Sequence, residues 1–181
     1  NGKTQLIVKL YPDGLGSGYL YQLAEQSTLK ARIMSNPHFH FPKKATAVVM
    51  IANGTGIAPF LGMIKDNAKQ IPVSLYAGFR HNNILTWQYQ EFAATEIKQK
   101  RLARLEIAFS REKEARYVMD LIRQEGNEII DLLENKGVIM ICGSLSMQKD
   151  VEKVLEELAV VRKNRSLDYY KKKNQILTDC Y

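Results

Sequence analysis

The stretch "AVVMIANGTGIAPFLGMI", residues 47–64, joins an apolar strand-like run to a glycine-rich turn and then to a helical pattern. Glycines in such a turn let backbone N–H groups approach a pyrophosphate, and the following helix adds the positive end of its dipole. Pro59 fits the start of that helix, because proline is well tolerated in a first helical turn. The third glycine of the dinucleotide fingerprint is absent, as is the acidic residue expected about 20 positions on. On its own, the turn fits either a nucleotide site or a plain strand–helix connection.

Strand-like and helix-like segments alternate from this stretch to the C-terminus. The continuous apolar runs are TAVVMIA (46–52), VSLYAGF (73–79), RLEIAFS (104–110) and GVIMICG (137–143). The amphipathic stretches between and after them are Ile57–Gln70, Trp87–Gln99, Val118–Gln124, Glu128–Asn135 and Met147–Arg162. This alternation predicts an α/β fold, a doubly wound five-stranded parallel sheet flanked by helices. Ligands of such sheets bind outside the carboxyl ends of the strands, which places the chemistry in the loops that follow them.

Residues 1–43 have a different pattern. Alternating strands are predicted at residues 4–11 and 27–34, with a turn at PDGLGSG between them and a loop at residues 35–42. Two strands without a sheet of their own cannot form an independent domain. We therefore expect residues 1–43 to be the end of a β-rich domain that begins in a longer chain, and residues 44–181 to form the α/β domain.

The end of the third apolar run carries a hydroxyl followed by several cations. Ser110 and Arg111 come first, and Lys113, Arg116 and Tyr117 follow shortly after. Charge-assisted donors of this kind match the oxygens of a phosphate monoester, and Tyr117 is suited to stacking on an adenine. A solvated charged turn would produce the same letters.

The composition is that of a globular protein without a membrane span. The chain has 181 residues, a formal net charge of +7 and no apolar run near the ~18 residues that cross a bilayer. Two cysteines far apart in sequence favour a reducing, cytoplasmic setting, and Cys142 by itself suits a small core residue. The three histidines lack metal-ligand spacing, so no metal is expected. No nucleic-acid-binding signature accompanies the positive charge, and the basic cluster at residues 161–173 fits a solvated helix face.

Short motifs in a fixed order give the chain a resemblance to a known family. They are GLGSGYL, FHFP, GTGIAPF, GFRHNN, AFSRE, MICGS, MQKDVEKVL and a C-terminal aromatic residue. Together they resemble the ferredoxin–NADP reductase superfamily, and within it the diflavin reductase branch with its sulfite reductase flavoproteins and microsomal NADPH–haemoprotein reductases. The resemblance covers essentially the whole chain. It implies an NADP(H)-binding domain preceded by the last strands of a β-barrel FAD-binding domain.

The resemblance also implies cofactor-binding roles for individual residues. The turn similar to the family's flavin-pyrophosphate turn contains Gly14, Gly16, Ser17 and Gly18. The positions similar to those that bind NADP(H) are Gly54, Thr55, Gly56, Pro59, Arg80, Ser110, Arg111, Arg116, Tyr117 and Gly143. Ala115 stands where the family usually has a lysine, so Arg116 or Lys113 must take that place.

Three further residues are similar to those around the reacting atoms. Cys142 corresponds to a cysteine beside nicotinamide C4, Asp179 to an acid that orients the reacting pair, and Tyr181 to the aromatic residue that covers the flavin. The implied reaction is hydride transfer from NADPH to flavin N5. The implied partner is a flavodoxin-, FMN- or haem-type electron acceptor.

Other interpretations stay open at this level. The arginine–tyrosine–serine flavin motif of the family is not in the chain, so only part of an FAD site is expected. A pyridine-nucleotide module with a regulatory role and no catalysis fits the strand-end cluster as well. A basic docking domain for protein or nucleic acid would leave that cluster unexplained.

Overall fold

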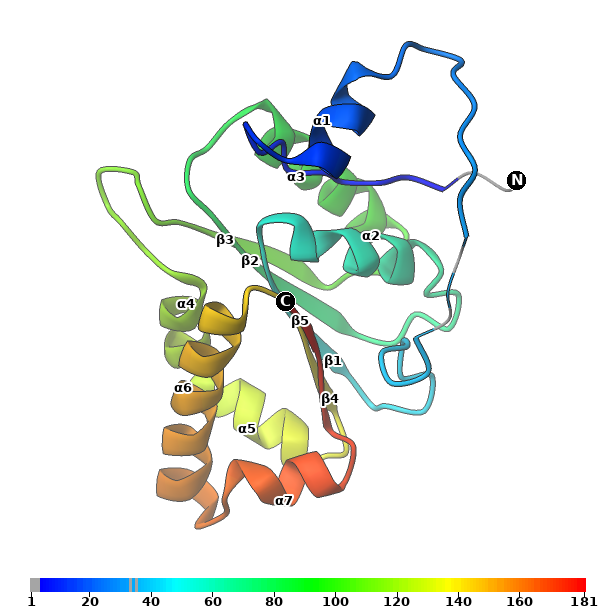
Figure 1. Ribbon diagram of the computed structural model, residues 1–181. Helices are drawn as coiled ribbons and strands as arrows, with labels where there is room; N and C mark the ends of the chain where they lie inside the picture. Colours follow the sequence, from blue (N-terminus) through cyan, green and yellow to red (C-terminus); the bar gives the residue numbers. More distant parts are fainter. Residues whose placement is uncertain (1–3, 33, 35) are drawn as a thin grey trace.

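A five-stranded parallel sheet forms the centre of the computed structural model, which describes residues 4–32, 34 and 36–181 (Figure 1). The strands lie in the order β3-β2-β1-β4-β5. They are β1 (Val48–Asn53), β2 (Val73–Phe79), β3 (Arg104–Phe109), β4 (Val138–Gly143) and β5 (Ile176–Cys180). Every pairing is parallel, so all five carboxyl ends meet at one edge of the sheet. The chain builds outward from β1 in both directions, which places the topological switch point between β1 and β4.

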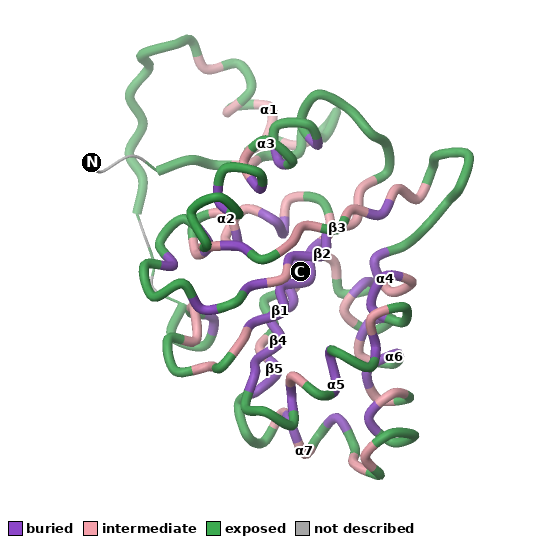
Figure 2. Tube along the Cα trace, turned by 180° about the vertical axis from the view of Figure 1, so that it is seen from behind, coloured by how far each residue is buried: buried purple, intermediate pink, exposed green. Residues whose placement is uncertain are grey.

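Helices cover both faces of this sheet. The covering helices are α2 (Ala58–Lys65), α3 (Ile84–Lys98), α4 (Val118–Gln124), α5 (Gly126–Glu134), α6 (Leu145–Lys163) and α7 (Leu167–Lys172), with a 3-10 turn at Gly54–Ile57. A further helix, α1 (Leu15–Gln22), has no buried residue and belongs to neither layer. The helices α2 and α3 lie on one face, and α4 to α7 lie on the other (Figures 1 and 2).

The strands are buried on both faces because their apolar runs are continuous. In β4 every residue is buried, with Ile139 and Ile141 packing toward α4–α6 and Met140 and Cys142 packing toward α2. This is the pattern of a parallel strand between two helical layers. The predicted α/β fold and its five-stranded sheet are confirmed. The fifth strand, β5, and the short helix α7 were not located by the apolar pattern.

Some helix boundaries differ from the predicted ones for local reasons. Helix α3 begins at Ile84, three residues early, because the Asn83 side chain accepts hydrogen bonds from the N–H groups of Leu85 and Thr86. Helix α2 ends at Lys65 rather than near residue 70. There the Asn67 side chain binds the backbone of the following loop, and this competes with continuation of the helix.

The N-terminal segment does not contain the two predicted strands in its described residues. Residues 4–11 are extended but unpaired, and the glycine-rich stretch predicted as a turn is largely the helix α1, of which no residue is buried. Ile33 of the second predicted strand and Ser35 of the predicted loop lie outside the described residues. A strand needs a partner for its backbone N–H and C=O groups, and residues 4–32, 34 and 36–43 find none among the described residues. The segment touches the core further along, where Phe39 packs against Phe60 with ring centroids 5.9 Å apart.

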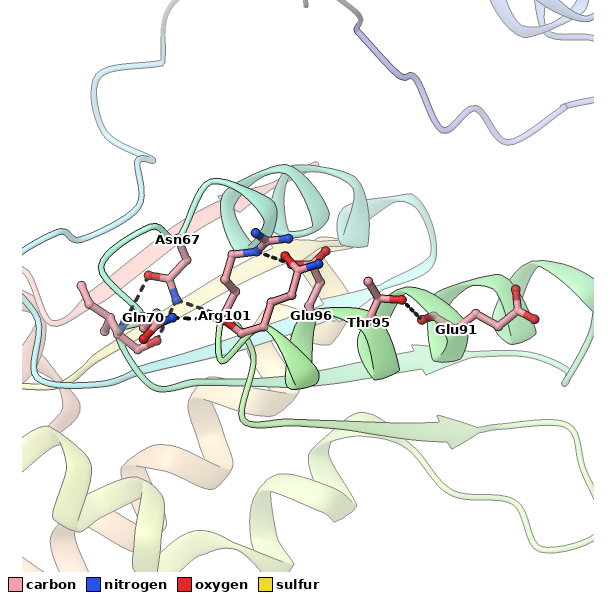
Figure 3. Close-up of polar contacts among 8 residues, drawn as sticks. Asn67, Gln70, Glu91, Thr95, Glu96 and Arg101 are labelled. Atoms are coloured by element: carbon pink, nitrogen blue, oxygen red, sulfur yellow. Dashed lines mark hydrogen bonds and ion pairs between the residues drawn. The ribbon is translucent and has the colours of Figure 1, made fainter.

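Buried polar side chains tie the helices together at the amino edge of the sheet (Figure 3). The Asn67 amide donates to the carbonyls of Ile71 and Arg101 at 2.8 and 2.9 Å, and it accepts from the Ile71 N–H at 3.1 Å. Beside it, the Arg101 guanidinium donates to the buried carboxylate of Glu96. This network joins the end of α2 to the end of α3 and satisfies groups that would otherwise be costly to bury.

Candidate functional site

A cavity of about 500 Å³ lies at the carboxyl edge of the sheet, at the switch point between β1 and β4. Loops that follow four strands contribute to its wall, together with the start of α6, the N-terminal segment and the last residue. Its lining comprises Lys9, Tyr11, Asn53, Gly54, Thr55, Gly78, Phe79, Arg80, Ser110, Arg116, Tyr117, Val118, Met119, Ser144, Ser146, Met147, Asp150 and Tyr181. A cavity of this size and position is the usual place for a nucleotide in a doubly wound sheet.

The loop after β1 approaches the neighbouring strand very closely. A Cβ atom on Gly56 would lie 2.2 Å from the carbonyl oxygen of Cys142, so only glycine fits there. Gly54 has a φ of +54°, in the left-handed region that favours glycine. Thr55 points into the cavity, and its hydroxyl lies 2.5 Å from the Tyr181 hydroxyl. Pro59 occupies the first turn of α2, as predicted, and does not line the cavity.

The loop after β4 is fixed to the loop after β1. Gly143 has a φ of +142°, and a Cβ there would lie 2.1 Å from the Asn53 side-chain oxygen. That oxygen accepts the Ser144 N–H at 2.9 Å, and the Asn53 amide donates to the Ser144 hydroxyl at 3.0 Å. The last residue joins the same loop, because the Tyr181 N–H donates to the Gly143 carbonyl at 3.0 Å.

The loops after β2 and β3 bring most of the predicted phosphate-binding side chains together. Arg80, Ser110, Arg116 and Tyr117 all line the cavity. The Arg116 guanidinium also donates to the Gln124 side chain at 2.7 Å, which holds it over α4. Arg111 is exposed and outside the lining, although its N–H donates to the Arg80 carbonyl at 2.9 Å. The predicted pair Ser110–Arg111 is therefore split, with only the hydroxyl on the cavity wall.

Cys142 and Asp179 are neighbours on adjacent strands, but neither lines the cavity. The Cys142 side chain is 3% exposed and packs toward α2. Burial, with a smaller contribution from the charge of Asp179, raises the pKa of the Cys142 thiol to about 12. The thiol is therefore protonated at neutral pH, which disfavours a nucleophilic role.

The four residues predicted to hold a flavin pyrophosphate do not reach this cavity. Gly14 precedes α1, and Gly16, Ser17 and Gly18 lie within its first turns. The Ser17 hydroxyl accepts the Tyr11 N–H at 3.2 Å and donates to the Gly14 carbonyl at 3.4 Å, so it is used locally. The described residues of this segment present Lys9 and Tyr11 to the cavity instead, and the Lys9 ammonium lies 4.7 Å from the Tyr11 ring centre.

Several lining residues were not predicted as site residues. Ser146, Met147 and Asp150 come from the first two turns of α6, and their spacing along one helix face is a signal that the sequence does carry. Asn53 and Ser144 lie at strand ends where the sequence places the chemistry, at 53–55 and 142–144, but neither was given a binding role. The role of Asn53 depends on Ser144, which is 91 positions away in the chain and close only in the fold.

A second cavity, of about 790 Å³, lies at the opposite edge of the sheet. Lys44, Lys136, Arg165 and Lys173 line it together with Tyr169. The Tyr169 ring lies 4.4 Å from the Arg165 guanidinium and 4.0 Å from the Lys173 ammonium, so these cations have a partner within the fold. The carboxyl ends of the strands do not meet at this second cavity, so the cavity of about 500 Å³ is the better nucleotide site. The cluster at residues 161–173, predicted to be one helix face, is divided into the end of α6, a turn that contains Arg165, and α7.

Two other classes of site find no support in the part of the chain that the structure describes. No group of three or more His, Cys, Asp or Glu side chains could hold a metal ion among the described residues. Within residues 4–32, 34 and 36–181, no helix is long and apolar enough to cross a membrane.

Comparison with known proteins identifies the domain. Residues 50–153, more than half of the chain, match the family described as the oxidoreductase NAD-binding domain. The chain belongs to this family. The matched range runs from the middle of β1 into α6 and therefore contains the four strand-end loops of the cavity.

Similar curated proteins include flavoprotein reductases of the kind that the motif order predicts. The sulfite reductase [NADPH] flavoprotein alpha-component of Buchnera aphidicola subsp. Schizaphis graminum (strain Sg) is 35% identical over 161 residues, covering 86% of this chain and 26% of that protein. The NADPH–cytochrome P450 reductase of Homo sapiens is 33% identical over 148 residues, covering 74% and 22%. A nitric oxide synthase-like protein of Bombyx mori is 32% identical over 167 residues, covering 85% and 15%. The predicted resemblance is confirmed, and the chain spans about a quarter or less of the length of these relatives.

Proposed function

We propose that this chain is the NADP(H)-binding part of a flavin-dependent reductase. The observation that carries the proposal is the cavity at the β1/β4 switch point, where Thr55, Arg80, Ser110 and Tyr117 from three different loops meet beside Tyr181. In this proposal residues 1–43 end an FAD-binding domain and residues 44–181 form the NADP(H)-binding domain. The names of two relatives, a sulfite reductase [NADPH] flavoprotein component and an NADPH–cytochrome P450 reductase, support the choice of cofactor.

The residues present fit a pyridine nucleotide with a 2′-phosphate. The absence of a Cβ on Gly56 lets the β1 loop lie against β4, which leaves room for a pyrophosphate above its backbone. Arg80 and Arg116 add two positive charges to the same wall, and Ser110 adds a hydroxyl. A guanidinium and a hydroxyl both donate hydrogen bonds to phosphate oxygens, so this wall suits the 2′-phosphate end. Tyr117, half exposed at the rim, is placed to stack on the adenine.

The other end of the cavity suits the nicotinamide. Bound NADPH supplies a hydride, which the flavin of the complete reductase accepts. The protein's residues contribute alignment: the Tyr181 backbone is bound to the β4 loop, the residue is 69% exposed, and we propose that its ring moves aside for the nicotinamide. That movement costs the single Thr55–Tyr181 hydrogen bond, on the order of 1 kcal/mol. In this proposal Cys142 and Asp179, which pair on β4 and β5, support the start of the loop after β4 and do not reach the cavity themselves.

The flavin site is a different matter. In the described residues, the segment predicted to bind the FAD pyrophosphate is helical and its Ser17 hydroxyl is engaged locally. These residues by themselves do not fit FAD, and no step is assigned to them. We propose that the flavin is held mainly by a part of a longer protein, and that electrons pass from it to a flavodoxin-like or haem-containing acceptor on the cytoplasmic side. The free Cys142 and Cys180 are consistent with such a reducing setting.

One observation favours the alternative of a binding module without catalysis. The Cys142 thiol, which the resemblance places beside the reacting carbon, is buried outside the cavity. Stopped-flow reduction of the flavin by NADPH in the longer protein separates the two. Rapid flavin reduction supports the reductase, and nucleotide binding without flavin reduction supports the module.

Calorimetric titration tests the assignment of the nucleotide. We expect 2′,5′-ADP and NADP⁺ to bind at least about 10-fold more tightly than 5′-AMP, since a charge-assisted hydrogen bond contributes about 1.5–3 kcal/mol. Equal affinities for AMP and 2′,5′-ADP would overturn the 2′-phosphate assignment.

A further inference from the structure

Asn53 links two loops that the nucleotide site needs. It is the last residue of β1, and its side chain crosses the switch point to the loop after β4. Its oxygen accepts the Ser144 N–H at 2.9 Å, and its amide donates to the Ser144 hydroxyl at 3.0 Å. The oxygen and the nitrogen of the Asn53 carboxamide therefore both bind Ser144. We call this pair of hydrogen bonds the Asn53–Ser144 clasp.

The clasp extends into helix α6 through the second partner. The Ser144 hydroxyl accepts the Met147 N–H at 3.2 Å and so caps the helix. The next turns of α6 supply Ser146, Met147 and Asp150 to the cavity wall. Because Asn53 orients the Ser144 hydroxyl, it acts on this wall without any direct contact with α6.

The geometry of Gly143 shows how tightly the clasp is built. A Cβ at this position would meet the Asn53 side-chain oxygen at 2.1 Å and the Asn53 backbone oxygen at 3.0 Å. The φ of +142° at Gly143 turns the chain so that the Ser144 N–H faces Asn53. The Asn53 side chain can therefore bind Ser144 only because Gly143 has no Cβ and lets the loop after β4 come this close.

We propose that Asn53 is a positioning residue that fixes the spacing of the β1 and β4 walls of the nucleotide cavity. The inference rests on the proposed function for the ligand, NADP(H), but the clasp itself is a property of the fold. A loss of the clasp widens the cavity between the Thr55 loop and the start of α6. Bound nucleotide then loses simultaneous contact with both walls, so its affinity falls without unfolding of the sheet.

The chain offers a matched control for this residue. Asn67 is also an asparagine whose side chain both donates and accepts, and it also ties two segments, but it does so at the amino edge of the sheet (Figure 3). We expect Asn67→Ala to lower the overall stability at least as much as Asn53→Ala does. A change in the nucleotide site should be caused by Asn53→Ala alone.

The test measures NADP⁺ affinity, unfolding by urea and amide hydrogen exchange in this chain. We expect Asn53→Ala to weaken NADP⁺ binding about 10-fold and Asn67→Ala to change it less than about 2-fold, although both lower stability. Asn53→Asp keeps an acceptor for the Ser144 N–H and loses the amide donor, so exchange of the Ser144 amide should be slower than in Asn53→Ala. Faster exchange of the Ser144 and Met147 amides is expected in Asn53→Ala and not in Asn67→Ala.

Each outcome decides the proposal. Equal losses of affinity in Asn53→Ala and Asn67→Ala would mean that Asn53 is merely structural. Unchanged exchange at Ser144 and Met147 would overturn the clasp whatever the affinity does. The exchange experiment needs no nucleotide, so a wild-type chain that fails to bind NADP⁺ would refute the proposed function and leave the clasp to be judged on exchange.

Discussion

The two edges of the same sheet use similar polar side chains for opposite purposes. At the amino edge, Asn67, Glu96 and Arg101 are bound to each other or to backbone and join α2 to α3. At the carboxyl edge, Arg80 and Ser110 face a cavity of about 500 Å³, and among the described residues their side chains form no hydrogen bond or ion pair. Polar groups that hydrogen-bond to each other stabilise the fold, whereas hydrogen-bond donors that face a cavity are available to a ligand.

The largest expected effect belongs to the amino edge. Arg101→Met leaves the Glu96 carboxylate, which is 3% exposed, without its partner. We expect the free energy of unfolding to fall more than in any variant below, because the buried Glu96 carboxylate is left without a cation beside it. Urea unfolding measures the change, and NADP⁺ affinity should stay within about 2-fold of wild type if only the carboxyl edge binds nucleotide.

A substitution of Gly56 tests the carboxyl edge of the sheet. Gly56→Ala places a Cβ 2.2 Å from the backbone carbonyl of Cys142, which cannot move away as a flexible side chain would. We expect a loss of about 2–3 kcal/mol in stability together with loss of NADP⁺ binding. Gly62→Ala is the control, because a Cβ there meets nothing within 4 Å and alanine favours a helix. Similar behaviour of the two variants would contradict the close packing of the β1 loop on β4.

The next variant is expected to change ligand affinity and to leave the free energy of unfolding unchanged. Ser110→Ala removes the hydroxyl that we assign to the 2′-phosphate and should weaken 2′,5′-ADP binding about 10-fold, since hydrogen bonds to charged groups contribute about 1.5–3 kcal/mol. Binding of AMP should barely change. Ser74→Ala is the matched control, because Ser74 lies near the amino end of β2, where its hydroxyl accepts from Arg104. An equal effect of both substitutions on 2′,5′-ADP would remove Ser110 from the site.

The smallest expected effect is a dependence of stability on alkaline pH. Burial raises the pKa of the Cys142 thiol from 9.0 to about 12, so the unfolded chain releases this proton at lower pH than the folded one. Stability from this group is therefore complete below pH 9 and is lost as the pH rises toward 12, by about 1 kcal/mol between pH 9 and 10. The measurement compares urea unfolding of wild type and Cys142→Ala at several pH values. An identical pH slope in both would show that the thiol is not buried as described.

The sequence predicted the sheet well because its signal is local. Four continuous apolar runs gave the positions of β1 to β4, and the loops after them contain Thr55, Arg80, Ser110 and Tyr117, all of which line the cavity. The two predicted N-terminal strands are not formed in the residues that the structure describes there, because alternation describes how a strand would pack and not whether a partner strand is present.

The remaining differences depend on distances that a sequence does not contain. Arg111 follows Ser110 directly, yet the direction of its side chain takes it away from the cavity wall. Cys142 lies next to the last residue of β4, and its thiol packs into the α2 layer below the strand end rather than reaching the cavity. The Asn53–Ser144 clasp joins residues 91 positions apart, and neither residue type signals the other.

The most direct test of the carboxyl edge as the nucleotide site is an NMR titration of the ¹⁵N-labelled chain with NADP⁺. We predict that the amide signals of Thr55, Arg80, Ser110, Tyr117 and Ser144 shift in proportion to occupancy. The signals of Asn67, Ile71, Lys136 and Lys173, at the amino edge and its second cavity, should stay in place. Shifts confined to Lys136 and Lys173, with none in the loops after β1 to β4, would contradict the account.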